Sequence, residues 1–257
     1  MRGTAPALCL TAALLAAPAA ACDYPGGPPD AREVRAEGEG VVWAQYSNAT
    51  EIYGHGVLGD RIEASVLRAM TPLTGPCVSM VYLGDEAVFE DVTPRIADVT
   101  GDGLNDVVVI ETRLDAGASL AVYGMDGEAF VKLAATPHIG LPFRWLAPAG
   151  IADFDGDGVL DVAYVETPHI GGTLRIWSFK DNAAREIASA PGFSNHRIGE
   201  NFITGGLRDC GAGPELVLPD ARWRRTLRAR LAGGAIDIEV AADDADPATI
   251  ARELECS

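Results

Sequence analysis

The sequence has few of the features that mark a membrane-spanning or nucleic-acid-binding protein. After the first 21 residues, no stretch reaches the roughly 18 to 20 apolar residues that a transmembrane helix needs. Lysine and arginine number only 20 against 37 acidic residues, which gives a formal net charge of −17. A chain this acidic is a poor partner for nucleic acid or for an anionic lipid surface. We therefore expect neither a transmembrane segment nor a nucleic-acid partner.

Familiar catalytic motifs are also missing. The chain has no G-x-S-x-G, P-loop or dinucleotide fingerprint, and its four histidines form no H-E-x-x-H or comparable metal motif. Two classes of function remain. One is a noncatalytic binding protein, and the other is an enzyme whose reactive groups are brought together only by the fold.

The N-terminus has the pattern of an export signal. A positive charge at Arg2 precedes an apolar run, Ala7–Ala17, and the small residues Ala19-Ala20-Ala21 follow. This order is typical of a cleaved secretory signal peptide over residues 1–21, which predicts a secreted or periplasmic protein. Cys22 follows directly and leaves a lipoprotein anchored at this residue as the alternative. However, Ala19 stands where lipoprotein signals usually carry Leu, Val or Ile.

Three further regions follow the signal. Residues 22–40, rich in proline, glycine and charge, are predicted to form an N-terminal arm or linker. Residues 41–246 contain short β-type runs broken by turn residues every eight to twelve positions, which predicts an all-β fold. Residues 247–257 form a C-terminal tail, where Asp246 can cap a short helix that starts at Pro247.

An internal repeat organises the β region. Ile96–Asp106 recurs as Ile151–Asp161 at an offset of 55 residues, and a degenerate copy, Leu207–Glu215, follows. Two-residue hairpin turns are expected at Asp126-Gly127, Asp181-Asn182, Gly233-Gly234 and, in an earlier unit, Gly59-Asp60. Units of about 55 residues indicate a propeller or a repeat array, and we expect a small β-propeller of about four to five blades.

The repeated segments carry the spacing of a calcium loop. Asp153, Asp155, Asp157 and Asp161 occupy positions 1, 3, 5 and 9 of the second loop, and Val159 at position 7 would offer its main-chain carbonyl. Carboxylates this close repel one another unless a cation lies between them. Ca²⁺ is suited to the loop because it accepts six to eight oxygen ligands in flexible geometry.

The first loop follows the same pattern with one carboxylate fewer. Its residues at positions 1, 3, 5, 7 and 9 are Asp98, Thr100, Asp102, Leu104 and Asp106. We expect it to bind Ca²⁺ more weakly, because a hydroxyl replaces one negative ligand. Neither loop is an EF-hand, since position 12 is Val109 in one and Tyr164 in the other rather than glutamate.

These two loops resemble those of FG-GAP (VCBS) repeats, the calcium-bearing blades of integrin-alpha-like propellers. The resemblance implies that each loop joins the first two strands of a blade and that the Asp and Thr side chains at its positions 1, 3, 5 and 9 bind the ion. It also implies a role in adhesion or ligand binding. We therefore expect a noncatalytic module that binds a protein or glycan, with a secreted propeller hydrolase or lyase acting on a polysaccharide as the alternative.

Four cysteines remain after signal cleavage, and an even number suits two disulfides in an oxidising compartment. Three pairings are possible. Proximity in sequence favours Cys210–Cys256, which would tie the C-terminal helix to the third loop in place of the lost calcium. The other pair would then be Cys22–Cys77, between the arm and the next blade.

Arginines and histidines outside the loops have structural interpretations. Folding the chain about Gly233-Gly234 sets Arg230 opposite Asp237 and Arg228 opposite Glu239, which leaves three arginines (Arg222, Arg224 and Arg225) as a solvated strand end. Loops that gather on one face could bring together residues from several of them, namely Arg144, Trp145, His169, His196 and Arg197. Exposed loop residues are the simpler interpretation.

Overall fold

The computed structural model describes Cys22, residues 24–71 and residues 77–256, so the predicted signal peptide lies outside the described residues. The described residues form seventeen β-strands, one 3-10 turn (η1) and one α-helix. The elements of the first sheet are β1 Val34–Arg35, β2 Trp43–Thr50, β3 Glu63–Met70, β4 Ser79–Tyr82, β5 Ala87–Phe89, β6 Arg95–Ala97, β7 Asp106–Arg113, β8 Gly117–Asp126 and β9 Ala129–Ala135. The remaining elements are β10 Leu146–Ala152, β11 Asp161–Glu166, β12 Thr173–Ser178, η1 Lys180–Asn182, β13 Arg185–Pro191, β14 Gly206–Asp209, β15 Pro214–Pro219, β16 Thr226–Ala232, β17 Ala235–Ala242 and α1 Pro247–Leu254.

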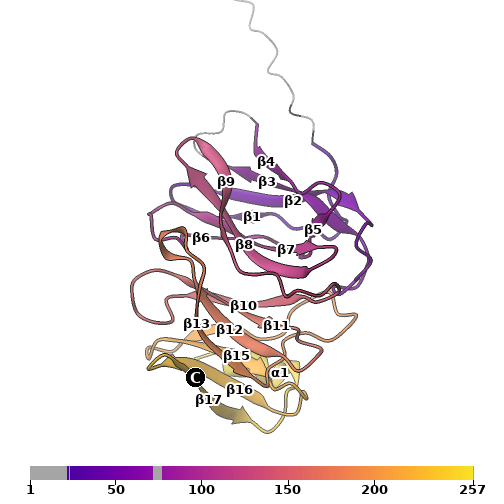
Figure 1. Cartoon of the computed structure of the whole chain (residues 1–257). Helices are drawn as coiled ribbons and strands as arrows, with labels where there is room; N and C mark the ends of the chain where they lie inside the picture. Colours follow the sequence, from indigo (N-terminus) through magenta and orange to yellow (C-terminus); the bar gives the residue numbers. More distant parts are fainter. Residues whose placement is uncertain (1–21, 23, 72–76, 257) are drawn as a thin grey trace, which may run out of the picture.

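The all-β prediction and the short C-terminal helix are confirmed. The strands form three antiparallel sheets, one with β1–β9 and two four-stranded meanders, β10–β13 and β14–β17. Figure 1 shows the sheets following one another along the molecule, with the first sheet at one end and the last at the other. Within the described part of the chain, no helix is long and apolar enough to cross a membrane.

Each repeat has the same local plan. A short strand leads into the repeated loop, and a longer strand follows it, in the pairs β6–β7, β10–β11 and β14–β15. The longer strands are almost entirely buried, because both faces of the sheet are covered. As expected, each loop therefore joins the first two strands of its unit.

The hydrophobic core is divided between successive units. One cluster joins β7 and β8 to β10 and β11, and another joins β11 and β12 to β15 and β16. A third lies between β2–β3 and β7–β8. The first unit is also fused to the second through backbone pairing, because β5 pairs with both β3 and β7. Such nearest-neighbour packing is typical of a repeat array.

The hairpin about Gly233-Gly234 is confirmed in its full register. Arg230 pairs with Asp237 and Arg228 with Glu239. Both glycines have positive φ, 58° and 82°, as a tight two-residue turn of this type requires. The three arginines before this hairpin do not belong to the strand, because β16 starts only at Thr226.

The other predicted two-residue turns are wrong in detail. Gly59-Asp60 lies in a long connection, since Thr50 pairs with Glu63 and residues 51–62 separate them. Residues 51–62 fold inward and bury Tyr53, so turn residues alone do not determine where this connection begins and ends. Asp181-Asn182 lies in the longer connection between β12 and β13, and the β8–β9 turn is centred on Gly127-Glu128, one residue later than predicted.

Both predicted disulfides are confirmed. Cys22–Cys77 and Cys210–Cys256 have Cα–Cα distances of 5.7 and 5.4 Å, within the usual range for disulfides. Because the Cys22 thiol is used in a disulfide, it is not available for lipid attachment in this form of the protein. The second bond holds α1 against β14 and β15, where Ile250 packs on Val217.

Candidate metal centre and histidine pocket

Asp153 shapes the backbone of the second loop. Its Oδ1 accepts hydrogen bonds from the backbone N–H groups of Gly156 (2.7 Å) and Asp157 (3.0 Å), and its Oδ2 accepts one from Gly158 (3.0 Å). Gly156 and Gly158 have φ values of 78° and 88°, which side-chain-bearing residues rarely adopt. The chain is thereby wrapped around the first carboxylate of the motif.

Three of the four predicted carboxylates converge. Asp153, Asp155 and Asp161 each offer an oxygen, and these atoms lie within 4.8 Å of one another. Asp161 is only 1% exposed, and its Oδ2 accepts a hydrogen bond from the Phe154 N–H group at 3.1 Å. Burial, followed by the negative charge of Asp155, raises the pKa of Asp161 to about 7. This crowding of hard oxygen donors fits a metal ion, which would relieve the repulsion.

Asp157 does not join this group. Its Oδ2 lies 2.9 Å from Nζ of Lys180, and its Oδ1 accepts a hydrogen bond from the Val159 N–H group. The bond from Lys180 holds the pKa of Asp157 below its usual value. Sequence spacing alone did not show this, because Lys180 arrives from the distant β12–β13 connection.

The first loop has the same backbone but a looser set of ligands. Asp98 accepts hydrogen bonds from the N–H groups of Gly101 (2.8 Å) and Gly103 (2.9 Å). The Thr100 hydroxyl donates to Asp106 Oδ2 at 3.0 Å, and the buried Oδ1 of Asp106 has no hydrogen-bond partner among the described residues. Three convergent acidic, histidine or cysteine ligands occur only in the second loop within the described part of the chain.

The two loops are neighbours in space. A β-carbon at Gly101 would lie 2.8 Å from Val159 Cγ2, so the loops are in contact. The β12–β13 connection joins them, since the Asp181 N–H group donates to the Thr100 carbonyl at 3.0 Å while Lys180 reaches Asp157. An ion in one loop would therefore stiffen a surface that both repeats share.

The third loop keeps the turn without the ligands. Asp209 Oδ1 accepts hydrogen bonds from the N–H groups of Gly211 (2.8 Å) and Gly213 (3.2 Å), as the first aspartate does in the other two loops. At positions 3 and 5, where the first loop has Thr100 and Asp102, this loop has Gly211 and Gly213. The first aspartate of each repeat thus has a structural role that does not depend on a metal.

Residues 98–164 match the family model of the FG-GAP-like repeat, a segment that contains both intact loops and the strands between them. The chain contains an FG-GAP-like repeat. A search of curated proteins finds no match. The degenerate third unit lies beyond the matched FG-GAP-like segment, although its strands and loop follow the same plan.

A pocket lies at the opposite end of β10 and β11 from the second loop. Trp145 immediately precedes β10 and Thr167 immediately follows β11, and both line this cavity of about 310 Å³. Phe143 and Thr167 in its wall have φ values of 53° and 49°, a conformation that is unfavourable for residues other than glycine. Such strain often occurs at functional sites.

One histidine of the pocket is held by a buried carboxylate. His55 Nδ1 lies 2.5 Å from Glu90 Oε1, and Glu90 also accepts a hydrogen bond from the Thr112 hydroxyl at 2.7 Å. Burial raises the pKa of Glu90. With Nδ1 donating to this carboxylate, Nε2 of the neutral His55 ring has a free lone pair.

A second histidine is oriented through a hydrogen-bonded chain. His196 Nε2 lies 2.9 Å from the Glu200 carbonyl, which can only accept, so this nitrogen carries the proton. His196 Nδ1 of the neutral ring then accepts from His169 Nε2 at 2.8 Å, which leaves a lone pair on His169 Nδ1. Burial, followed by the neighbouring His196, lowers the pKa of His169 to about 4.

Part of this pocket was expected from the sequence. Arg144, Trp145 and His169 line it, and His196 accepts a hydrogen bond from His169. Arg197 is elsewhere, with its guanidinium 4.0 Å from the centre of the Trp223 ring. His55 and Glu90 were not anticipated, because each stands alone in sequence and only the inward fold of residues 51–62 brings His55 to Glu90.

The low pKa of His169 predicts a loss of stability in mild acid. The folded state keeps the His169 ring neutral, whereas the unfolded chain protonates it below its usual pKa of 6.5. The free energy of unfolding therefore keeps its full value above about pH 6.5 and decreases as the pH falls toward 4. Urea unfolding at pH 7, 5.5 and 4 with constant calcium should show that His169→Gln loses less stability over this range than the wild type. His138→Gln, outside the pocket, should follow the wild type. Parallel curves for wild type and His169→Gln would contradict the prediction.

Proposed function

We propose that this protein is an extracytoplasmic, calcium-binding module that binds a protein or glycan ligand without catalysing a reaction. The convergence of Asp153, Asp155 and Asp161 carries the proposal. Asp157 and the Val159 carbonyl stand at the remaining positions of this loop. In the first loop the corresponding ligands are Asp98, Thr100, Asp102, the Leu104 carbonyl and Asp106. The ion would hold adjacent repeats in a fixed arrangement and so prepare a rigid binding surface.

We further propose that residues 41–246 form an open, propeller-like array of four blades, with residues 22–40 as an arm and residues 247–257 as a tail. The shared cores between successive units support this arrangement. Helix α1 packs on β14 and β15, on the last sheet. A terminal cap of this kind is what an open repeat array needs to stay soluble.

Two disulfides support the extracytoplasmic location, because such bonds persist in oxidising compartments. We propose that residues 1–21 direct export and are removed, which releases the protein into the periplasm or the medium.

Calorimetric titration of the chelator-treated protein with CaCl₂ tests the metal assignment. We expect a high-affinity site that is lost in Asp153→Asn/Asp155→Asn and kept in Asp181→Asn, an acidic neighbour outside the cluster. A weaker second site should be lost in Asp106→Asn. Absence of calcium binding at millimolar concentrations would refute the metal proposal, and MgCl₂ serves as the comparison because Mg²⁺ requires stricter octahedral geometry.

The histidine pocket favours a second candidate function, in which the protein is a hydrolase or a lyase that cleaves a polysaccharide. His55, held by buried Glu90, has the arrangement of a general base, and His169 offers another nitrogen lone pair nearby. Release of reducing ends or unsaturated products from a polysaccharide panel would support it. The activity should fall about 10²- to 10⁴-fold in His55→Ala, whereas His138→Ala should retain it. No product from any polysaccharide would leave the binding function as the sole candidate.

A further inference from the structure

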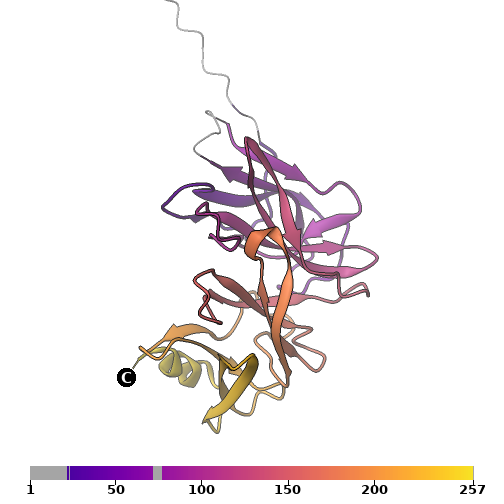
Figure 2. The same ribbon diagram turned by 60° about the vertical axis from the view of Figure 1, so that its left-hand side comes forward.

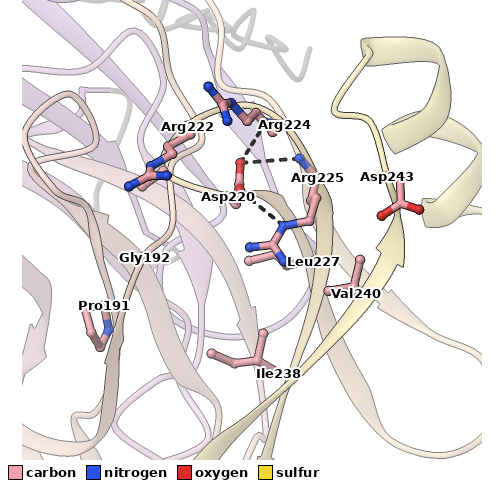
Figure 3. Close-up of a pocket in the computed structure, with 11 residues that line it drawn as sticks. Pro191, Gly192, Asp220, Arg222, Arg224, Arg225, Leu227, Ile238, Val240 and Asp243 are labelled. Carbon is pink, nitrogen blue, oxygen red and sulfur yellow. Dashed lines mark hydrogen bonds and ion pairs between the residues drawn. The ribbon is translucent and has the colours of Figure 1, made fainter.

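A second cavity lies in the C-terminal part of the protein, between the end of β13 and the edge strand β17. Its volume is about 680 Å³, within the range of small-molecule sites. Figure 3 shows its composition: Leu227, Ile238 and Val240 provide an apolar wall, and Arg222 and Arg225 approach from the loop of residues 220–225. We call this cavity the arginine groove.

The loop above the groove is held in place before any ligand arrives. Asp220 Oδ1 accepts hydrogen bonds from the N–H groups of Arg224 (2.7 Å) and Arg225 (3.3 Å), and the Asp220 N–H group donates to the Arg225 carbonyl. Trp223 has a left-handed φ of 56°, and its indole N–H group donates to the buried Ser194 hydroxyl at 3.1 Å. A fixed loop places its arginines at little entropic cost to binding.

The arginines are only partly neutralised. Arg225 Nε lies 3.4 Å from Asp220 Oδ2. The side chains of Arg222 and Arg224 have no acidic partner among the described residues, in a chain whose net charge is −17. In Figure 3, Arg225 extends over Leu227 and Arg222 points to the side of Gly192. The groove therefore presents the unpaired Arg222 guanidinium and the partly neutralised Arg225 guanidinium beside an apolar wall, and Asp243 also lines it.

The apolar wall is unusually open to water. Ile238 and Val240 are 44% and 45% exposed, although the same faces of the preceding strands are buried against the second sheet. They belong to β17, which pairs only with β16 and forms the edge of its sheet. Exposed apolar side chains beside incompletely neutralised arginines indicate a ligand with two parts, one charged and one apolar.

We propose that the arginine groove binds a small organic anion with an apolar body. Its carboxylate or sulfate group lies against Arg222 and Arg225, and its body covers Leu227, Ile238 and Val240. An anionic membrane surface is disfavoured because the acidic protein as a whole would be repelled. The inference rests on the proposed ligand-binding function and names its ligand class, but it does not require calcium, since both metal loops lie outside the groove.

Titration calorimetry with decanoate, below its micelle concentration, tests the groove, and 2-naphthoate distinguishes an aromatic body from an aliphatic one. We expect at least one of these acids to bind and the decyltrimethylammonium cation and acetate to bind far more weakly. Arg222→Gln/Arg225→Gln should weaken binding at least about tenfold, since a charge-assisted bond is lost. Asp220 still holds the loop backbone in this variant. Arg35→Gln/Arg61→Gln, which also removes two positive charges but from β1 and the β2–β3 connection, is the matched control.

A second variant tests the apolar wall of the groove separately from its arginines. Ile238→Thr keeps a β-branched residue on the edge strand and should weaken decanoate without changing acetate. Binding that survives excess chelator supports the groove even if the calcium proposal fails. The groove proposal is overturned if neither acid binds, if the cationic amphiphile binds equally well, or if Arg222→Gln/Arg225→Gln binds like Arg35→Gln/Arg61→Gln.

Discussion

Chelation of calcium is expected to lower the melting temperature of the protein by about 5–10 °C. A ligand that binds only the folded state at about one hundred times its Kd stabilises it by about 2.7 kcal/mol. For a chain of this size, each kcal/mol shifts the midpoint by about 2–4 °C. Differential scanning calorimetry with CaCl₂ and with excess chelator measures the shift.

Variants assign this shift to the second loop. Asp161→Asn should remove most of the calcium-dependent shift, because Asp161 is the buried member of the carboxylate cluster. In the chelated protein the same change should cost little, since it also removes a buried negative charge that repels Asp155. Asp85→Asn, at an exposed turn outside the loops, should behave like the wild type. A chelator-independent melting curve would show that calcium has no structural role.

Removal of the Cys210–Cys256 disulfide should have a comparably large effect. The bond closes a segment with a sequence separation of 46 residues. In the chain-entropy model, such a closure stabilises the folded state by about 4 kcal/mol. Urea unfolding of Cys210→Ser/Cys256→Ser should show this decrease in the free energy of unfolding. Limited proteolysis should cut near α1 first, because the helix loses its covalent link to the third loop.

The Cys22→Ser/Cys77→Ser variant is the comparison for this experiment. It removes a disulfide of similar span, with a separation of 55 residues, at the other end of the array. It should lower global stability without exposing α1 to protease. If Cys210→Ser/Cys256→Ser unfolds like the wild type, the disulfide does not replace a lost metal as the element that holds the third loop.

Helix α1 covers part of the last described sheet. In a repeat protein, each unit buries its apolar face against a neighbouring element. Here Ile250 and Leu254 pack near Val217, and Arg228 on β16 forms an ion pair with Glu253 of the helix at 2.7 Å. Figure 2 shows the helix beside the final sheet, away from the preceding one.

The sequence by itself determined the local features of this protein. Period-2 alternation and Gly233-Gly234 were sufficient for the register of β16 with β17, because cross-strand pairing follows from the turn. The repeated aspartates and glycines located the three loops, since each first aspartate bonds to the N–H groups of its own loop. The cysteines paired as their proximity in sequence suggested.

Only the tertiary structure decided which side chains from different units meet. Lys180 pairs with Asp157, His55 reaches Glu90, and Arg222 and Arg225 lie beside an apolar wall from β16 and β17. The strand β5 likewise joins two repeats into one sheet, although each repeat alone predicts a separate blade. These contacts depend on how neighbouring sheets pack, and no local periodicity carries that information because the residues involved belong to segments far apart in the chain.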